Sequence, residues 1–385
     1  MDLLHPIWAE INIDNLINNI DEIKRQSKGS EIISVVKANA YGHGAVEVSK
    51  TLLKRGIKKL AVANIIEAIE LRDNDIKSPI MLLGISENYA IDSIIRYDVE
   101  PTISTLSFAK ELNKKAIASN KIINVHIAID SGMGRIGFKN IENDINDIIE
   151  ISKLTNLNIE SIFSHFSTAD SIDKSYSDYQ IEVYNNILSS LEERGLKINK
   201  KNLSNSAAII DIPKSHCAYV RPGIIQYGYY PSSEVNINNL KIKPVLTWKT
   251  RIIHLKEVEE NEFIGYGKTF KTTRKTKIAT LPVGYADGYS RALSNKGKVI
   301  INGQLAPIIG NVCMDQFMVD VTDIKDVKAF DEVILLGESG NVKFNAEDMA
   351  KIIGTISYEV LCLIGRRAPR VYIKNGEIEK ISYLM

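Results

Sequence analysis

The chain has 385 residues, of which 48 are basic and 47 acidic, giving a formal net charge of +1. This balance excludes the strong basic field expected of a nucleic-acid binder or of a protein attracted to anionic membranes. The length allows one large domain and a second smaller one. The three cysteines, Cys217, Cys313 and Cys362, are few and odd in number, which argues against a disulfide framework and fits a reducing compartment.

Targeting and metal-binding signals are not found in the sequence. The first residues lack the apolar segment of a signal peptide, and no apolar run approaches the roughly 20 residues that span a membrane. Cysteine and histidine do not cluster with the spacing of metal ligands. We therefore expect a cytoplasmic protein with no metal site and with no nucleic-acid or membrane partner.

Short apolar runs alternate with helical segments over the first two thirds of the chain. The runs expected to be strands are residues 33–37, 60–63, 80–83, 100–104, 124–130, 159–165, 202–206 and 219–223. Helical spacing is found in residues 14–26, 51–55, 67–72, 108–118, 141–154 and 179–194, and an aspartate at the start of the first could cap it. Eight strands alternating with helices predict an α/β fold, a (β/α)8 TIM-type barrel, with a doubly wound open sheet as the alternative.

The pattern changes near residues 229–233. We expect a barrel domain over residues 1–235 and a mainly β C-terminal domain over residues 236–385. Strand-like runs there are residues 245–254, 277–282, 297–301, 306–309, 317–321, 332–336 and 370–373. The pairs Asn302-Gly303 and Asn375-Gly376 predict hairpin turns, and one helix is expected over residues 346–353.

Lys37 closes an apolar, β-branched run. Burying an ammonium group is costly unless the lysine loses its proton or forms an imine, and both outcomes make it chemically useful. The alternative is that its side chain reaches the surface past the end of the strand.

Other expected strands also end in polar residues. In a barrel, chemistry takes place at the carboxyl ends of the strands. The side chains at these ends are Lys37, Tyr41, Asp130, Arg135, His165, Asn205, Ser206 and Arg221. Any one of them could be structural, but a whole set converging on one rim predicts an active site.

The segment Asp130–Gly137 satisfies the pattern GxGxxG through Gly132, Gly134 and Gly137. A dinucleotide-binding loop is one interpretation. However, the motif follows the fifth expected strand and contains an arginine, which does not help a close approach of the backbone. The other interpretation is a rim loop that directs Arg135 at a carboxylate, for which a guanidinium is well shaped.

The loops after the last two expected strands are where barrels commonly bind a phosphate. Asn205 and Ser206 offer small polar groups there, and Gly223 lies in the next loop. Each motif could also be an ordinary helix cap or turn. An imine-forming lysine together with a phosphate cradle suggests pyridoxal 5′-phosphate, which needs both.

Seven motifs, taken together and in order, resemble those of bacterial alanine racemases. They are VVKANAYGHG, DSGMGRIG, HFSTAD, RPGIIQYG, GYGKTF, LPVGYADGY and NVCMDQ, within a resemblance that runs from Trp8 to Arg370. The resemblance implies a barrel that binds pyridoxal phosphate, a β domain, and a head-to-tail homodimer with shared active sites. It also implies racemisation of L-alanine and D-alanine, with an amino acid as the small-molecule substrate and D-alanine supplied for peptidoglycan.

Roles for individual residues follow from the same resemblance. Lys37 would hold the cofactor as a Schiff base and act as the base for D-alanine, and Tyr266 of the partner subunit would act for L-alanine. Arg221 would donate to the pyridine nitrogen, with His165 near the ring. Ser206, Gly223, Ile224 and Tyr358 would hold the phosphate, with Tyr41 alongside. Arg135 and Met314 of the partner subunit would receive the substrate carboxylate, and Tyr285 would line the entrance.

Two positions depart from the pattern of many relatives. Ala128 stands where a carbamylated lysine is common, so the anion that would orient Arg135 is missing. Asn202 stands where some relatives have a histidine that supports the pyridine-binding arginine. An amide can still accept a hydrogen bond from Arg221, but without charge.

Three other functions remain open at the level of sequence. The pocket near Tyr285, Tyr358 and Met314 could admit amino acids other than alanine. A barrel that binds pyridoxal phosphate without turnover is another alternative, but such barrels lack a second domain, and the segment Gly265-Tyr266-Gly267 with its second base argues against it. A decarboxylase on a similar two-domain fold is the third alternative, which is disfavoured because the motifs do not fit it.

Overall fold

Eight parallel strands close into a barrel in the computed structural model, which describes residues 4–383. The strands follow one another in chain order: β2 (Glu31–Val35), β3 (Lys59–Val62), β4 (Ile80–Ile85), β5 (Glu100–Ile103), β6 (Ile123–Ala128), β7 (Leu157–Phe163), β8 (Lys201–Ser204) and β9 (Tyr219–Val220). The ring closes where β2 pairs with β9, at Glu31 with Tyr219 and Ile32 with Val220. The predicted barrel is confirmed, and the open sheet is excluded.

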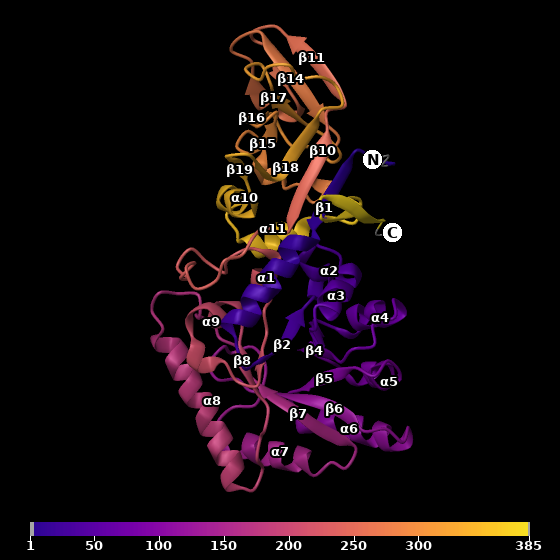
Figure 1. The fold of residues 1–385 in the computed structure, drawn as a ribbon, viewed down its shortest axis with the longest axis vertical. Coiled ribbons are helices and arrows are strands. Elements are labelled where there is room, and N and C mark those ends of the chain that lie inside the picture. The colour runs from indigo at the N-terminus through magenta and orange to yellow at the C-terminus, as the bar shows by residue number, and fades with distance from the viewer. Residues whose placement is uncertain (1–3, 384–385) are drawn as a thin grey trace. The chain divides into compact units, whose positions relative to one another are not determined.

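Helices alternate with these strands and lie outside them. They are α1 (Ile13–Gln26), α3 (Ala45–Lys54), α4 (Ile65–Asp73), α5 (Ile91–Arg96), α6 (Leu106–Ala118), α7 (Glu142–Ser152), α8 (Ser175–Glu193) and α9 (Ser206–Asp211). Figure 1 shows α4 to α8 arranged around the barrel strands. The apolar face of α1 is buried at Leu16, Ile20 and Ile23, as its spacing predicts. The residue that caps it is Asn12 rather than an aspartate, since its Oδ1 accepts from the Asn15 N–H at 2.9 Å.

Several barrel strands end earlier than their sequence predicts. The run expected over residues 33–37 leaves the sheet at Val35, and that expected over 124–130 leaves it at Ala128. The polar residues that follow are therefore in loops rather than in the hydrogen-bonded ladder. The same is true after β7, β8 and β9, so the candidate residues are carried by the rim and not by the strands.

A mainly β unit forms the other part of the structure. Its sheet has the order β11-β14-β17-β16-β15-β18-β10-β1-β20-β21, with β19 paired to β18. The strands are β1 (Ile7–Asn12), β10 (Leu246–Arg251), β11 (His254–Val258), β14 (Thr276–Leu281), β15 (Lys298–Ile301), β16 (Gln304–Ile309), β17 (Phe317–Asp320), β18 (Glu332–Ser339), β19 (Val342–Phe344), β20 (Arg370–Lys374) and β21 (Glu377–Ser382). A separate pair joins β12 (Phe263–Ile264) to β13 (Phe270–Lys271), and the helices are α10 (Ala346–Ile353) and α11 (Ser357–Leu363).

The predicted hairpins of this unit are confirmed. Asn302 and Gly303 have φ of 49° and 73° between β15 and β16, and Asn375 and Gly376 have φ of 51° and 78° between β20 and β21. Positive φ at both central residues is the geometry that an Asn-Gly pair adopts at little cost.

The two units are not two continuous halves of the chain. By their contacts, the described residues up to Asn15, the segment Tyr41–Gly44 and the residues from Pro244 onward form the β unit, while Leu16–Ala40 and Ala45–Lys243 form the barrel unit. The first strand of the chain, β1, lies between β10 and β20 in the β sheet. A single boundary, such as the one expected at residue 235, therefore does not describe the two units, because each unit contains more than one segment of the chain.

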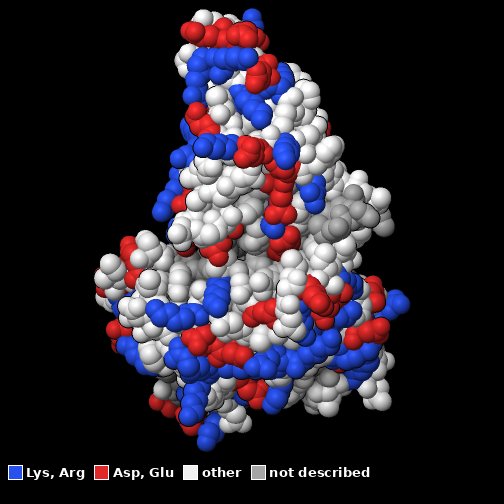
Figure 2. Space-filling view, turned by 45° about the horizontal axis from the view of Figure 1, so that its top comes forward, with Lys and Arg blue, Asp and Glu red and all other residues white. Residues whose placement is uncertain are grey.

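The surface mixes charges of both signs. On the face drawn in Figure 2, lysine and arginine side chains are interspersed with aspartate and glutamate side chains. Within residues 4–383, no helix has the length and apolar character needed to cross a membrane. In the same residues, no group of three or more histidine, cysteine, aspartate or glutamate side chains gathers as metal ligands would.

Buried charges fill the amino-terminal end of the barrel. The Lys59 Nζ lies 2.7 Å from an Oε of Glu100 and 2.9 Å from an Oε of Glu160. Glu160 also accepts hydrogen bonds from Lys200 at 2.8 Å and from the Tyr219 hydroxyl at 2.7 Å. The two lysines balance the two glutamates, so the charges at this end are internally compensated.

The network sets the ionisation of Glu160. Burial alone would raise the pKa of this carboxyl, but the hydrogen bonds from Lys200, Tyr219 and Lys59 outweigh it and lower the pKa to about 2. The ordinary value is 4.5. The stabilisation from this carboxylate is therefore complete above pH 4.5 and is lost as the pH falls from there toward 2.

We expect Glu160→Gln to lower the free energy of unfolding at pH 7 by about 2 kcal/mol, because two lysines lose their anionic partner. The difference from the parent protein should shrink as the pH falls from 4.5 toward 2. Urea denaturation at pH 7, 4 and 3 measures both effects. Glu192→Gln, an exposed change on α8, is the control, and an effect of Glu160→Gln that is equal at every pH would contradict the pKa assignment.

Candidate active site

Lys37, Arg135, His165, Ser206 and Arg221 all follow barrel strands and so lie at one end of the barrel, as predicted. Lys37 comes two residues after β2, and the others come after β6, β7, β8 and β9. Burial lowers the pKa of His165 well below its usual range, and the charges of Arg221, Arg135 and Lys37 lower it further. His165 is thus a neutral imidazole surrounded by cations.

An unusual turn follows Lys37. Ala38, Asn39, Ala40 and Tyr41 have φ between 52° and 54°, in the left-handed region that residues with a side chain rarely occupy one after another. The turn is held by two side chains. Glu67 accepts the N–H groups of Ala38 and of Ala63, both at 2.7 Å, and the Oδ1 of Asn39 accepts the Ala45 N–H at 2.8 Å. Such strain persists only where the surroundings determine it, and it fixes the path of the chain at Lys37.

Arg221 is buried without a carboxylate partner. It is 3% exposed. Its Nη1 donates to the carbonyl oxygen of Asn202 at 3.0 Å and to the Oδ1 of the same residue, and its Nη2 donates to the carbonyl of Ser164 at 2.5 Å. Burial lowers its pKa to about 10, with a smaller contribution from Arg135, so the guanidinium remains charged at neutral pH. Its Nε donates no hydrogen bond to any residue among 4–383, which leaves one donor for another group.

His165 lies beside this guanidinium. Its Nδ1 is 3.4 Å from the Arg221 Nη2. Because the guanidinium has only donors, Nδ1 is assigned as the unprotonated, accepting nitrogen, and the proton is on Nε2. A neutral histidine cannot contribute positive charge here, so the cation at this point of the rim is Arg221.

The loops after β8 and β9 meet through a hydrogen bond. The N–H of Gly223 donates to the Oγ of Ser206 at 2.8 Å. Asn205 caps α9, since its Oδ1 accepts from the Ala208 N–H at 3.1 Å. Ser206 keeps its own hydroxyl proton, and Ile224 opens a 3-10 helix with its N–H unused by that helix. This is a set of donors suited to an anion.

The loop from Asp130 to Gly137 does not have the form of a dinucleotide site. The Oδ1 of Asp130 accepts the N–H groups of Gly132 at 3.1 Å and of Gly134 at 2.9 Å. These are the amides that a pyrophosphate would need. The chain then returns to β6, where the Phe138 N–H donates to the Ala128 carbonyl at 2.9 Å. Arg135 is at the exposed tip, as expected of a rim loop.

The β unit gathers three further candidates. Tyr266, Tyr285 and Met314 are 76%, 44% and 52% exposed. The Asn311 side chain donates to the Tyr266 carbonyl at 2.8 Å, and the Tyr285 N–H donates to the Cys313 carbonyl at 3.1 Å. One segment, residues 311–314, therefore holds the two tyrosines and carries the methionine.

Tyr41 and Tyr358 form a second pair in the β unit. Their ring centroids are 6.1 Å apart, and the rings are inclined by 51°. Tyr41 is buried, and Tyr358 on α11 is partly buried. The sequence does not indicate this contact, because 316 intervening residues separate the two tyrosines.

Both halves of the chain match families of known proteins. The alanine racemase N-terminal domain model matches residues 11–231, and the alanine racemase C-terminal domain model matches residues 245–372. A protein named alanine racemase from Clostridium kluyveri is 56% identical over 98% of this chain and 96% of its own. The chain belongs to the alanine racemase family. The resemblance drawn from its motifs is confirmed.

Solved alanine racemases share the whole fold. The alanine racemase of Clostridium difficile 630 is 44% identical, with a TM-score of 0.95 over 100% of both chains. An alanine racemase from Bartonella henselae, described with covalently bound pyridoxal phosphate, is 27% identical, with a TM-score of 0.84 over 96% of this chain and 99% of that one.

Sequence reasoning missed Glu67 as a member of the site. Its spacing from Asn64 is that of a capping box, which predicts a purely local role. The Oδ1 of Asn64 does accept two N–H groups of α4, at 3.0 and 3.1 Å. The carboxylate of Glu67 instead bridges the turn after Lys37 to the end of β3.

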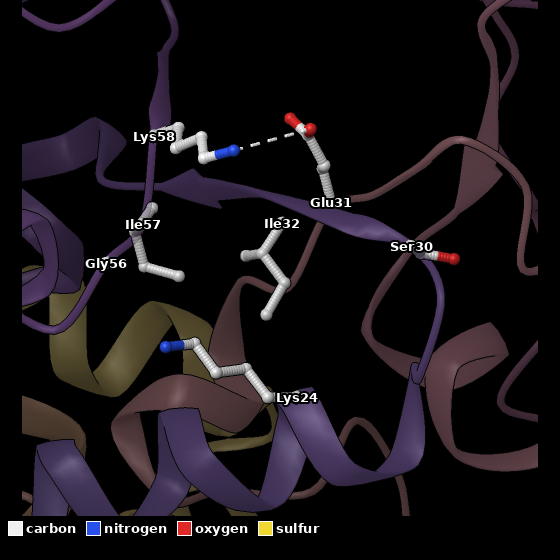
Figure 3. A pocket seen from close by; sticks show the side chains of 7 residues that line it. All are labelled: Lys24, Ser30, Glu31, Ile32, Gly56, Ile57 and Lys58. Carbon is white, nitrogen blue, oxygen red and sulfur yellow. Dashed lines mark ion pairs between the residues drawn. The ribbon is translucent and has the colours of Figure 1, made fainter.

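A cavity of about 200 Å³ lies elsewhere in the barrel unit. It is lined by Lys24, Ser30, Glu31, Ile32, Gly56, Ile57 and Lys58, and Figure 3 shows Lys58 directed at Glu31, 3.8 Å away. Glu31 begins β2, whereas Lys37 follows the end of that strand. The cavity is therefore at the amino-terminal end of the barrel, away from the rim that carries the candidate site.

We expect Glu67→Gln to loosen the turn after Lys37. The substitution keeps the shape of the side chain but replaces one accepting oxygen by a donor and removes the charge that strengthens both hydrogen bonds. Hydrogen exchange at the Ala38 and Ala63 amides should accelerate by about tenfold or more. Glu70→Gln, on the same helix, is the matched control. Unchanged protection in Glu67→Gln would show that the turn does not depend on this carboxylate.

Proposed function

We propose that this protein interconverts L-alanine and D-alanine with pyridoxal 5′-phosphate, by two bases on opposite faces of the substrate. Membership of the alanine racemase family over nearly the whole chain carries the proposal. The rim of the barrel supports it, because a lysine, a buried arginine and a set of anion-binding donors lie at one end of the strands.

The donors at the rim fit the cofactor. The hydroxyl of Ser206 and the N–H of Ile224 are available for a phosphate, and Gly223 is hydrogen-bonded to that serine. The unused Nε–H of Arg221 fits the acceptor nitrogen of a pyridine ring. Lys37 would hold the cofactor covalently, with Tyr41, Tyr358 and Asn205 completing the phosphate end. Bound pyridoxal phosphate supplies an electron sink for charge at the substrate Cα.

Two bases account for racemisation. A proton must leave one face of Cα and return to the other, and one base on each face does this without turning the substrate over. Lys37 would serve the face of D-alanine, and Tyr266 of the partner subunit the face of L-alanine. A tyrosine can accept a proton only where cations stabilise its phenolate. Arg221 supplies the charge for this, since His165 is neutral.

Arg221 also limits what the site can do. With a pKa of about 10, the guanidinium donates a hydrogen bond at neutral pH but keeps its proton. It therefore leaves the ring nitrogen of the cofactor unprotonated. We infer that this shortens the lifetime of charge at Cα and disfavours side reactions such as transamination.

The substrate carboxylate would be received by Arg135 and by Met314 of the partner subunit, with Tyr285 lining the entrance. Arg135 is exposed at the tip of its loop and makes no ion pair with residues 4–383, so its guanidinium is available. A planar guanidinium can hold a carboxylate through two parallel hydrogen bonds.

A homodimer with shared sites is supported by the exposure of the second base. Tyr266 is 76% exposed on its own chain, and its hydroxyl has no hydrogen-bond partner among residues 4–383. A base that works in a protected site must be covered by another surface, and a second copy of the chain offers one.

We further propose a cytoplasmic enzyme that supplies D-alanine for peptidoglycan. Its three cysteines are free thiols, as a reducing compartment would keep them.

Purified protein supplied with pyridoxal phosphate should bring solutions of L-alanine and of D-alanine to the same endpoint of zero optical rotation, because two opposed bases remove and return the proton on either face. Polarimetry measures this directly. Loss of optical rotation from solutions of other amino acids under the same conditions would favour a broad amino-acid racemase. Unchanged alanine from a protein that binds the cofactor would contradict the proposal and favour a carrier without turnover.

Mixing two inactive variants tests the sharing of sites. If each site takes Lys37 from one chain and Tyr266 from the other, a heterodimer of Lys37→Ala and Tyr266→Phe has one intact site. Random reassociation of equal amounts should then restore about one quarter of the parent activity. Each variant reassociated with itself is the control. Heterodimers demonstrated by mass spectrometry without recovered activity would contradict shared sites.

A further inference from the structure

Helix α8 contacts the loops that carry two of the candidate residues. Gln180 is fully buried. Its Nε2 donates to the carbonyl of His165 at 3.0 Å, and its Oε1 accepts from the N–H of Ser167 at 3.0 Å and from the hydroxyl of Ser167 at 3.2 Å. One side chain thus uses both of its polar ends to hold the backbone of the loop after β7.

The same face of α8 also holds the loop after β6. Tyr176 lies one helical turn before Gln180, so the two side chains share a face. Its hydroxyl donates to the carbonyl of Gly132 at 2.7 Å. A Cβ on Gly132, whose φ is +133°, would be only 2.8 Å from this hydroxyl and 3.4 Å from the Cγ of Gln180. Glycine therefore allows the loop to approach the helix this closely.

A pair of buried serines joins the two loops to each other. The Oγ atoms of Ser131 and Ser164 are 2.7 Å apart, and the Ser164 hydroxyl is also 2.8 Å from the carbonyl of Ile129. Ser164 precedes His165 and offers its carbonyl to Arg221. Displacement of the loop after β7 would move both of these groups.

We propose that Tyr176 and Gln180 are positioning residues, which fix the loop of Arg135 and the loop of His165 against one rigid helix and so set the separation of these two side chains. This deepens the proposed function and rests on it. In that function, Arg135 holds the substrate carboxylate and His165 lies beside the cofactor. Their separation decides how the substrate Cα is presented to the two bases.

Tyr176 and Gln180 hold different loops, one that would bind the substrate and one that would lie beside the cofactor. Tyr176 contacts the Arg135 loop directly, and Asp130 and the Ser131–Ser164 pair also support that loop. Gln180 acts on the His165 loop, and through Ser164 on Arg221. A displacement of about 1 Å in a positioned group is enough to slow a reaction strongly. Loss of the two contacts should therefore affect different kinetic parameters.

Tyr176→Phe removes one hydrogen bond and keeps the ring. We expect the KM for alanine to rise by about fivefold, with kcat and the dissociation constant for pyridoxal phosphate unchanged. Tyr179→Phe is the matched control. It makes the same chemical change three residues along the helix, where the ring centroid of Tyr179 lies 5.6 Å from that of Tyr176. An equal KM in the two variants would overturn the role of Tyr176.

Gln180→Glu keeps the acceptor for Ser167 and removes the donor to His165. We expect the dissociation constant for pyridoxal phosphate, measured by equilibrium dialysis, to rise by about fivefold or more, together with a lower kcat. Gln180→Met, which removes all three hydrogen bonds at similar length, should weaken cofactor binding further. Cofactor affinity equal to that of the parent in either folded variant would overturn the role of Gln180. Cofactor binding is measured without turnover, so failure of the parent to racemise alanine would count against the proposed function and not against this role.

Discussion

The buried, charged guanidinium of Arg221 is the feature on which the rest of the site depends. It is held by carbonyl oxygens and an amide of the strands and loops around β7 and β8, and not by a carboxylate. A charge in this position is tolerable only because several neutral dipoles solvate it in fixed directions. The consequence is a buried positive charge at the rim that makes no ion pair with any carboxylate of residues 4–383.

The charged side chains at the two ends of the barrel have different partners. At the amino-terminal end, Lys59 lies between Glu100 and Glu160, and the charges are compensated within the protein. At the carboxyl end, the carboxylates of Asp130 and Glu67 are used to bind backbone N–H groups, which shapes the loops and leaves the cations to act on ligands. One end stabilises the fold, and the other is the end that, in the proposed function, would receive the cofactor phosphate and the substrate carboxylate.

The departures from the family pattern have a consistent effect. At position 202 the amide oxygen of Asn202 accepts from Arg221, while its Nδ2 is buried without a partner among residues 4–383. At position 128 the small side chain of Ala128 places no anion beside the Arg135 loop. With these residues in place, neither Arg135 nor Arg221 makes an ion pair with a carboxylate of residues 4–383. The neutral contacts that orient them, including those of α8, therefore carry more of the positioning.

The sequence by itself determined the architecture and the identity of the chemical groups. Its alternation of apolar runs and helical segments gave all eight barrel strands, because burial on both faces enforces continuous apolar stretches. Asn302-Gly303 and Asn375-Gly376 located two hairpins, since the required φ values are local properties of these residues. The ordered motifs identified the family, and Lys37 and Arg221 stood out as charged residues at the ends of apolar strands.

Only the tertiary structure decided how these groups are held and charged. The strands end before their polar residues, and β1 belongs to the β unit. The side chain of Glu67, on α4, holds the turn after Lys37 by accepting the Ala38 N–H. His165 is neutral because burial lowers its pKa and the charges of three nearby cations lower it further. Gln180 holds its backbone carbonyl from a helix whose spacing shows only an amphipathic face. These facts depend on which segments meet in space. A sequence records local preferences and burial, whereas hydrogen-bond partners and pKa values are set by neighbours that are distant along the chain.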